Sequence, residues 1–328
     1  MNIDWEPLRQ IIDGHQRFVL TSHKNPDADA LGSELAMAGF LDGLGKSVRI
    51  INPSASPTNL QFLDPDGRIK KLGDGVTVEE ALDTDVHVVL DTGAWQQLLK
   101  MADVVRNSSA AKVVIDHHVS SDDLGATEFK DVRAEATGAM LYRMAESLGF
   151  PVTEQIAVPL YCAIATDTGW FRFPSTTRDT MRIAGELIDA GAQPSVIYEL
   201  LYERFSPGRL RLAGVALDRV ATAADGRLAY TWVQQADIKR TGARPADTEN
   251  LVNECLKIEG TQCAFIAIEQ PNKQIKVSFR SRPGLDVAAI AETFGGGGHK
   301  QASGATLPGP MDDAREKVLA ALYAALNE

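Results

Sequence analysis

Three short apolar runs, residues 18–20, 88–90 and 113–115, constrain the fold of this chain more than any other feature. Consecutive β-branched and aliphatic residues are typical of strands that are buried on both faces of a parallel sheet. Polar stretches with aspartate or histidine follow each run within a few residues. Because the carboxyl ends of parallel strands meet at one edge of a sheet, we expect these polar side chains to converge there. The pattern predicts an α/β fold with a doubly wound parallel sheet.

The length of 328 residues favours two domains, each with its own core. We predict a doubly wound domain over residues 1–190, a linker over 191–208 and a smaller α/β domain with a mixed sheet over 209–328. The linker carries Pro194 and Pro207 and a helical middle, residues 195–204. The second domain should contain strands 228–233, 263–269 and 274–280, with a turn at Pro271–Asn272, and a final helix over 311–326.

In the first domain, strands alternate with segments of helical periodicity, as in βαβ units. Glycines at 45 and 191 follow two of these segments and indicate where the helices end. We predict a strand over residues 48–51 and helices over residues 33–44, 137–148, 154–165 and 177–190.

Composition excludes several classes of function. The chain is 44% hydrophobic but has no long apolar run, and its first residues are acidic, so we expect a cytoplasmic protein without a membrane partner. A net charge of −11 argues against binding long duplex nucleic acid, although short phosphorylated substrates remain open. The three cysteines form no C-x-x-C pair, which argues against a disulfide framework or a thiolate zinc site.

Four polar stretches at the ends of apolar segments contain the acids and histidines of interest: residues 22–29, 91–93, 116–118 and 166–169. Each one alone has a plain structural alternative, because aspartate and asparagine are common in turns and helix caps. Their recurrence favours a two-metal site instead, since such a site needs several carboxylates and a few imidazoles. Oxygen-rich ligands without thiolate indicate two divalent ions, Mn²⁺ first, with Mg²⁺ or Co²⁺ as alternatives. The chemistry predicted is phosphoester hydrolysis.

The chain resembles the DHH phosphoesterases through His-Lys-Asn-Pro-Asp-Ala-Asp-Ala-Leu-Gly-Ser, Asp-Thr-Gly, Asp-His-His and Thr-Asp-Thr-Gly-Trp-Phe. Its second half resembles the DHHA1 domain through Val-Ser-Phe-Arg-Ser and Gly-Gly-Gly-Gly-His-Lys-Gln-Ala-Ser-Gly. The resemblance implies one metal ion on His23, Asp27 and Asp91, and a second on Asp29, Asp91, His117 and Asp167. It also implies that Asp91 bridges the ions, Asp116 orients an imidazole and His118 faces the scissile phosphate or its leaving oxygen.

On the substrate side, the DHHA1 resemblance indicates a phosphate clamp formed by Arg280, Ser281, Gly297, Gly298 and His299. A guanidinium matches a terminal phosphate with two parallel hydrogen bonds, and glycine allows a phosphate to approach the backbone. A solvated strand residue and a mobile glycine turn are the alternatives.

The family branch that the chain resembles contains oligoribonuclease (nanoRNase) and pAp-phosphatase enzymes. The resemblance implies hydrolysis of short single-stranded oligoribonucleotides to mononucleotides and of pAp to AMP, in a possible homodimer. Hydrolysis of c-di-AMP or pApA is an alternative that the sequence does not separate. A nucleotide-binding regulator without activity is a third possibility, which the intact acids and histidines oppose.

Overall fold

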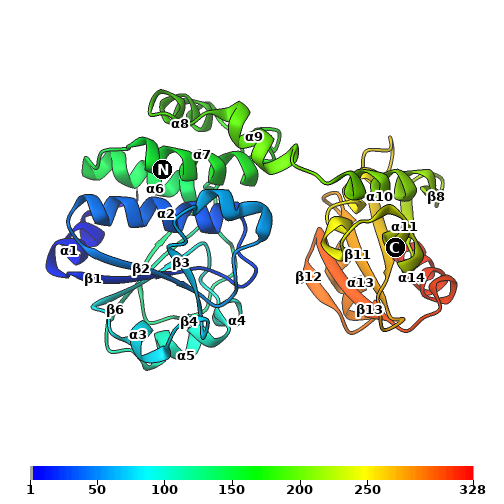
Figure 1. Ribbon diagram of the computed structural model, residues 1–328, viewed down its shortest axis with the longest axis horizontal. Coiled ribbons are helices and arrows are strands. Elements are labelled where there is room, and N and C mark those ends of the chain that lie inside the picture. The colour runs from blue at the N-terminus through cyan, green and yellow to red at the C-terminus, as the bar shows by residue number, and fades with distance from the viewer. Residues whose placement is uncertain (1–2, 328) are drawn as a thin grey trace. The chain divides into compact units, whose positions relative to one another are not determined.

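The computed structural model describes residues 3–327, except for the side chain of His299. The chain divides into two compact units between Arg204 and Phe205, and each unit is built around its own sheet (Figure 1). The segment predicted as a linker contains helix α9, Pro194–Tyr202, which belongs to the first unit.

The first unit contains a seven-stranded sheet in which all neighbouring strands are parallel. The strand order is β4-β3-β2-β1-β5-β6-β7, so the chain builds outward from β1 and then restarts beside it at β5. This reversal confirms the doubly wound fold and marks the sheet edge where ligands usually bind. The strands are β1 Arg17–Thr21, β2 Ser47–Asn52, β3 Ile69–Leu72, β4 Gly75–Val76, β5 Val86–Leu90, β6 Ala111–Asp116 and β7 Thr127–Lys130.

Helices cover both faces of this sheet (Figure 1). One face carries α1 Glu6–Gly14, α2 Ala28–Gly43, α6 Thr137–Leu148 and α7 Glu154–Asp167, with α8 Arg178–Asp189 and α9 beyond them. The opposite face carries α3 Val78–Leu82, α4 Trp95–Leu98 and α5 Lys100–Asn107, and a short 3-10 helix spans Thr58–Leu63. Within residues 3–327, none of the helices has both the length and the apolar composition that a membrane crossing requires.

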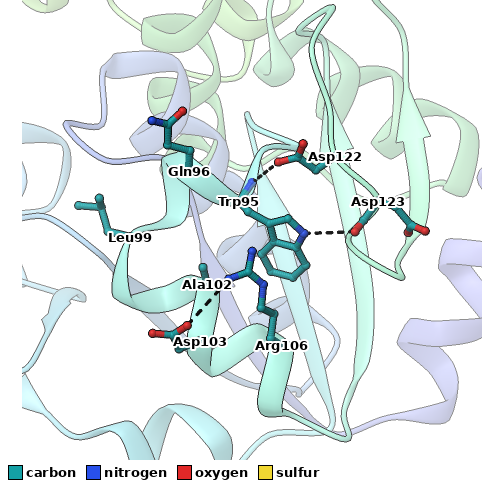
Figure 2. Close-up of a pocket in the computed structure, with 8 residues that line it drawn as sticks. All are labelled: Trp95, Gln96, Leu99, Ala102, Asp103, Arg106, Asp122 and Asp123. Carbon is teal, nitrogen blue, oxygen red and sulfur yellow. Dashed lines mark hydrogen bonds and ion pairs between the residues drawn. The ribbon is translucent and has the colours of Figure 1, made fainter. Parts of the chain in front are cut away.

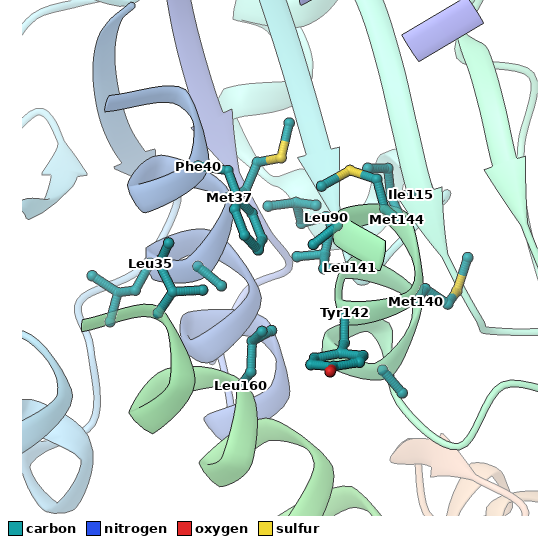
Figure 3. Close-up of a cluster of buried hydrophobic side chains, with 14 of the residues drawn as sticks. Leu35, Met37, Phe40, Leu90, Ile115, Met140, Leu141, Tyr142, Met144 and Leu160 are labelled. Atoms are coloured by element: carbon teal, nitrogen blue, oxygen red, sulfur yellow. The ribbon is translucent and has the colours of Figure 1, made fainter. Parts of the chain in front are cut away.

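Helix α2 is the centre of the larger core, because it is buried on almost every side between the sheet and helices α6 and α7. Figure 3 shows Met37 and Phe40 of α2 beside Leu90 of β5 and Leu141 of α6. Gly32 of α2 and Gly138 of α6 allow the helices to pack this closely. A Cβ atom at Gly32 would lie 2.5 Å from the carbonyl oxygen of Pro159 in α7.

Two helix boundaries differ from the predicted ones in a way that affects the site. Helix α2 begins at Ala28, five residues earlier than predicted, because the Asp27 side chain accepts the N–H groups of Asp29 and Ala30 as an N-cap. Helix α7 continues two residues beyond the predicted end and finishes at Asp167. Asp29 and Asp167 therefore lie on helices rather than in loops.

The second unit contains a six-stranded sheet in the order β12-β13-β11-β10-β9-β8. Strands β9 and β10 are parallel and the other pairs are antiparallel, which confirms the mixed sheet. Its strands are β8 Ala221–Ala223, β9 Leu228–Val233, β10 Cys263–Glu269, β11 Ile275–Ser281, β12 Gly297–His299 and β13 Ala302–Leu307.

Helices α10 Pro207–Asp218, α11 Gln235–Thr241 and α12 Val252–Cys255 pack on one face of this second sheet, and a 3-10 turn spans Pro245–Thr248. Helices α13 Val287–Glu292 and α14 Met311–Leu326 pack on the other face. The last helix has the predicted bounds. The turn between β10 and β11 contains the predicted Pro271–Asn272 pair and reaches a left-handed residue at Lys273, φ 65°.

Candidate metal centre

The predicted ligands of the first unit come from five elements that end at one edge of its sheet. His23 follows β1, Asp91 directly follows β5, and His117 directly follows β6. The remaining acids lie at the start of α2 and on the last residue of α7. Three groups of these side chains place one potential ligand atom each within 4.8 Å of one another: Asp91, His117 and His118; His23, Asp27 and Asp91; and Asp29, His117 and Asp167.

Asp91 occupies the middle of this arrangement. Its Oδ2 lies 3.3 Å from His23 Nε2, whereas its Oδ1 lies 3.5 Å from His117 Nε2. The side chain is almost completely buried, and the Thr137 hydroxyl donates to Oδ1 at 2.9 Å. Its backbone is left-handed, with φ 62°, a conformation that aspartate tolerates better than most residues. The two oxygens of one carboxylate thus face two different histidines.

Asp29 is fixed by the N-terminus of helix α6. Its two oxygens accept the backbone N–H groups of Thr137 at 2.7 Å and Gly138 at 2.9 Å. A Cβ atom at position 138 would lie 2.7 Å from Ala163 Cβ and 3.3 Å from Asp29 Oδ1, so glycine is required for this approach. From this position Asp29 Oδ2 lies 3.7 Å from His117 Nε2, and Asp167 Oδ2 lies 3.6 Å from the same nitrogen.

Backbone carbonyls set the orientation of two imidazoles. His23 Nδ1 lies 2.9 Å from the carbonyl oxygen of Lys24, and His117 Nδ1 lies 3.1 Å from that of Ala134. A carbonyl oxygen only accepts, so Nδ1 must carry the hydrogen in both rings. In the neutral rings Nε2 then keeps its lone pair and points into the group of carboxylates. This is the arrangement expected of histidines that bind a metal through Nε2.

His118 has different surroundings. Its Nδ1 and its backbone N–H both contact Asp116 Oδ1, at 2.9 and 3.0 Å. The hydrogen bond that His118 donates to Asp116 raises the pKa of His118. Burial acts to raise the pKa of Asp116, but the contacts from His118 and the charge of Lys130 outweigh it and the pKa lies below its usual value. Asp116 therefore stays ionised and orients the imidazole of His118, a side chain that is 44% exposed.

The carboxylates of the centre destabilise one another in the absence of a cation. Burial raises the pKa of Asp91 well above its usual value, and the charges of Asp29 and Asp27 act in the same direction. Burial also raises the pKa of Asp29, and it raises that of Asp167 to about 7. A divalent cation would remove this repulsion, and carboxylate and imidazole groups are suitable ligands for Mn²⁺ or Mg²⁺. The side chains present therefore fit the predicted metal ions.

Sequence reasoning did not identify the groups behind these ligands. Glu34, a charged residue inside the apolar helix α2, is fully buried and accepts from Asn52 Nδ2 at 2.8 Å. Asn52 Oδ1 accepts the N–H of Ser22, the residue before His23, at 3.0 Å. The signal in the sequence was the acid itself, because a carboxylate in an otherwise apolar helix needs a buried partner.

The loops that carry Asp91 and His117 are joined beside a surface pocket of about 730 Å³ (Figure 2). The backbone N–H of Trp95 donates to Asp122 Oδ2 at 2.8 Å, and its indole N–H donates to the carbonyl of Asp123 at 3.2 Å. Arg106 lies over the indole ring, 4.2 Å from its centroid. These contacts hold the segment after β5 against the segment after β6.

In the second unit, Arg280 lies on β11 and lines a pocket of about 240 Å³ together with Lys276 and Ser278. Burial lowers the pKa of Arg280, and its Nη1 donates to the carbonyl of Phe279. The Ser281 hydroxyl donates to the carbonyl of Leu285 at 2.7 Å, so its hydrogen is already used.

The glycine-rich segment of the second unit is a strand rather than a free turn. Residues 297–299 form β12, and His299 pairs with Ala302, which in turn pairs with Arg280. Gly298 has φ 145°, and a Cβ atom there would lie 2.6 Å from the carbonyl oxygen of Ala302, whereas Gly297 borders open space. The predicted role of the His299 imidazole lies outside the described part of the structure.

Comparisons with known proteins agree with this architecture. Residues 17–164 match the model of the DHH family, N-terminal domain, and residues 225–328 match the DHHA1 domain. The bifunctional oligoribonuclease and PAP phosphatase NrnA of Thermus thermophilus is 30% identical over 327 residues, which cover 97% of this chain and 94% of that protein. The Bacillus subtilis protein of the same name is 29% identical, over 92% of each chain.

Solved structures share the fold over nearly the whole length. An exopolyphosphatase-related protein from Bacteroides fragilis has a TM-score of 0.92 at 28% identity, covering 97% of this chain and 95% of that one. Exonuclease RecJ bound to manganese has a TM-score of 0.58 at 15% identity, over 98% of this chain and 94% of its own, and therefore shares the fold alone. The fold and the site define a phosphoesterase with acidic and imidazole groups at its sheet edge. The chain belongs to the DHH family and carries the DHHA1 domain.

Proposed function

We propose that this protein hydrolyses short oligoribonucleotides to mononucleotides and pAp to AMP, with two divalent ions as cofactors and Mn²⁺ as the preferred one. The observation that carries the proposal is the position of Asp91, whose two oxygens face His23 and His117 separately. A shared carboxylate of this kind is what two neighbouring ions require. The NrnA relatives, which are named for both activities, support the choice of substrates.

The first ion would be held by His23, Asp27 and Asp91, and the second by Asp29, Asp91, His117 and Asp167. When bound, such a pair of ions activates a water molecule and stabilises charge on the phosphate. The protein's own groups fix the geometry. The amides of α6 hold Asp29, and backbone carbonyls hold the two histidine rings.

His118 is the proposed proton donor to the leaving oxygen. Asp116 accepts the hydrogen of His118 Nδ1 and raises the pKa of His118, which favours the protonated imidazole that a proton donor requires. In the second unit, Arg280 is proposed to bind a substrate phosphate, with Gly297, Gly298 and His299 beside it. Ser281 is proposed to support the Arg280 strand, because its hydroxyl is donated to Leu285. The cytoplasmic location, the homodimer and the domain bounds 1–190, 191–208 and 209–328 remain predictions.

Hydrolysis of pAp, pApA, a short oligoribonucleotide and c-di-AMP, with and without Mn²⁺, tests the proposal. We expect metal-dependent release of AMP from the first two and of mononucleotides from the third. Asp91→Asn should lower kcat/KM by at least about 100-fold, since even changes to groups that merely support metal ligands cost 10–100-fold. Preference for c-di-AMP or pApA over pAp and the oligoribonucleotide would replace the substrate assignment. Nucleotide binding without any hydrolysis would indicate a regulator.

A further inference from the structure

A strained turn follows Asp167 directly and is not explained by metal binding. Gly169, Trp170 and Phe171 have φ values of 58°, 62° and 61°. Left-handed backbone at two successive bulky residues is energetically unfavourable and tends to occur where function requires it. The turn is held to the end of α7, because the N–H of Trp170 donates to the carbonyl of Ala165 at 2.6 Å.

The turn places Trp170 against two tyrosines of α9. The Trp170 ring centroid lies 5.0 Å from that of Tyr198 and 5.7 Å from that of Tyr202, and the tyrosine rings are 5.0 Å apart. Tyr198 and Tyr202 are four residues apart and thus lie on one face of the helix. Each tyrosine remains 39% exposed, although burial of a large aromatic side chain stabilises the folded protein.

Arg172 adds a positive charge to this group. It is exposed, its Nε donates to the carbonyl of Gly169 at 2.7 Å, and it forms no ion pair with any of the described residues. Burial raises the pKa of Tyr202, and the charge of Arg172 acts in the opposite direction. We call Trp170, Arg172, Tyr198 and Tyr202 the aromatic patch.

We propose that the aromatic patch is a nucleobase subsite of the metal centre, in which a base of the substrate stacks on the exposed tyrosine rings and Arg172 contacts its phosphate or its ring. Exposed aromatic rings beside an unpaired arginine are the groups that bind single-stranded nucleotides. Only two residues separate Trp170 from Asp167, and the Trp170 N–H is bonded to Ala165 on the last turn of α7, so the patch begins at the end of α7 that carries the predicted ligand. Stacking is available to every base, so the subsite would recognise the presence of a base rather than its identity. The inference rests on the proposed function.

Steady-state kinetics of the full-length protein with pApA test the subsite. Tyr198→Ala and Tyr202→Ala should raise KM by about 5- to 100-fold, the range expected for one lost stack, with the effect concentrated in KM rather than kcat. Tyr198→Phe should restore the wild-type KM because it keeps the ring. Val196→Ala, which shortens another exposed side chain of α9, is the matched control and should leave KM within about twofold.

A binding measurement provides a second readout. A non-hydrolysable dinucleotide that contains 2-aminopurine should lose fluorescence on the wild-type protein through stacking, and less on Tyr198→Ala or Arg172→Met. If either tyrosine variant unfolds, Arg172→Met still tests the patch from the exposed turn. Wild-type hydrolysis of pApA combined with unchanged KM and quenching in the variants would disprove the subsite alone. Absence of hydrolysis by the wild type would instead disprove the proposed function.

Discussion

His87 is a buried titratable residue that makes the stability of the first unit depend on pH. It lies in the central strand β5, is fully buried, and neither ring nitrogen has a hydrogen-bond partner among the described residues. Burial lowers its pKa to about 4, with further contributions from the charges of Lys112 and Arg49. The folded protein therefore holds His87 neutral at a pH where an unfolded chain would protonate it.

We predict that this histidine destabilises the protein in mild acid. Because the folded pKa lies below the ordinary 6.5, the contribution to stability is complete above about pH 6.5 and is lost as pH falls toward 4. Between pH 8 and pH 5 the wild type should lose about 2 kcal/mol more free energy of unfolding than His87→Leu. Urea titrations of both proteins at the two pH values measure this, and equal losses would contradict it.

Helix α2 combines the main core of the first unit with a polar contact to the site. Oε2 of Glu34 accepts from the Asn52 amide, whereas Oε1 has no hydrogen-bond partner among residues 3–327, and burial raises the pKa to about 7. A carboxylate oxygen that accepts from Nδ2 determines which way the Asn52 amide points, and thus turns Oδ1 toward the N–H of Ser22. The helix thereby positions the loop that carries His23.

Replacement of Glu34 tests this contact at the scale of the element. Glu34→Met removes the acceptor while keeping an apolar side chain of similar size, so the thermal midpoint of the metal-free protein should stay equal or rise. The affinity for Mn²⁺ at the predicted site formed by His23, Asp27 and Asp91 should fall about 10- to 100-fold, as for other groups that support metal ligands. Glu34→Gln keeps an acceptor and serves as the control. The affinities for Mn²⁺ are measured by calorimetric titration. If Glu34→Met binds both ions as tightly as the wild type does, Glu34 does not position the loop that carries His23.

Sequence patterns located the elements that carry long apolar or periodic segments, and missed those without them. The strands before His23, Asp91 and His117 were found because their residues are buried on both faces. Short edge strands such as β4, of two residues, and β12, made of Gly297–His299, carry too few side chains for any periodicity. Contacts such as Thr137 with Asp91 join residues 46 positions apart, which no local pattern encodes.

The molecule as a whole consists of two units with separate cores, and all predicted metal ligands lie in the first. Metal binding should therefore stabilise one unit only. In scanning calorimetry of the full chain, Mn²⁺ at 100 times its dissociation constant should add about 2.7 kcal/mol per bound ion to the unit with the DHH fold and leave the other transition in place. Asp91→Ala should abolish the shift, and a common shift of both transitions would show that the units unfold together.

The close packing of α2, α6 and α7 has a consequence for how this chain can evolve. Gly32 meets a backbone carbonyl and Gly138 meets both a neighbouring helix and the Asp29 carboxylate, so even one added methyl group forces the backbone to move. A saturation scan scored by survival would find these two positions as intolerant as the acids themselves. Sequence invariance among homologues would then mark both the closely packed glycines and the metal ligands, and would not distinguish a packing role from a chemical one.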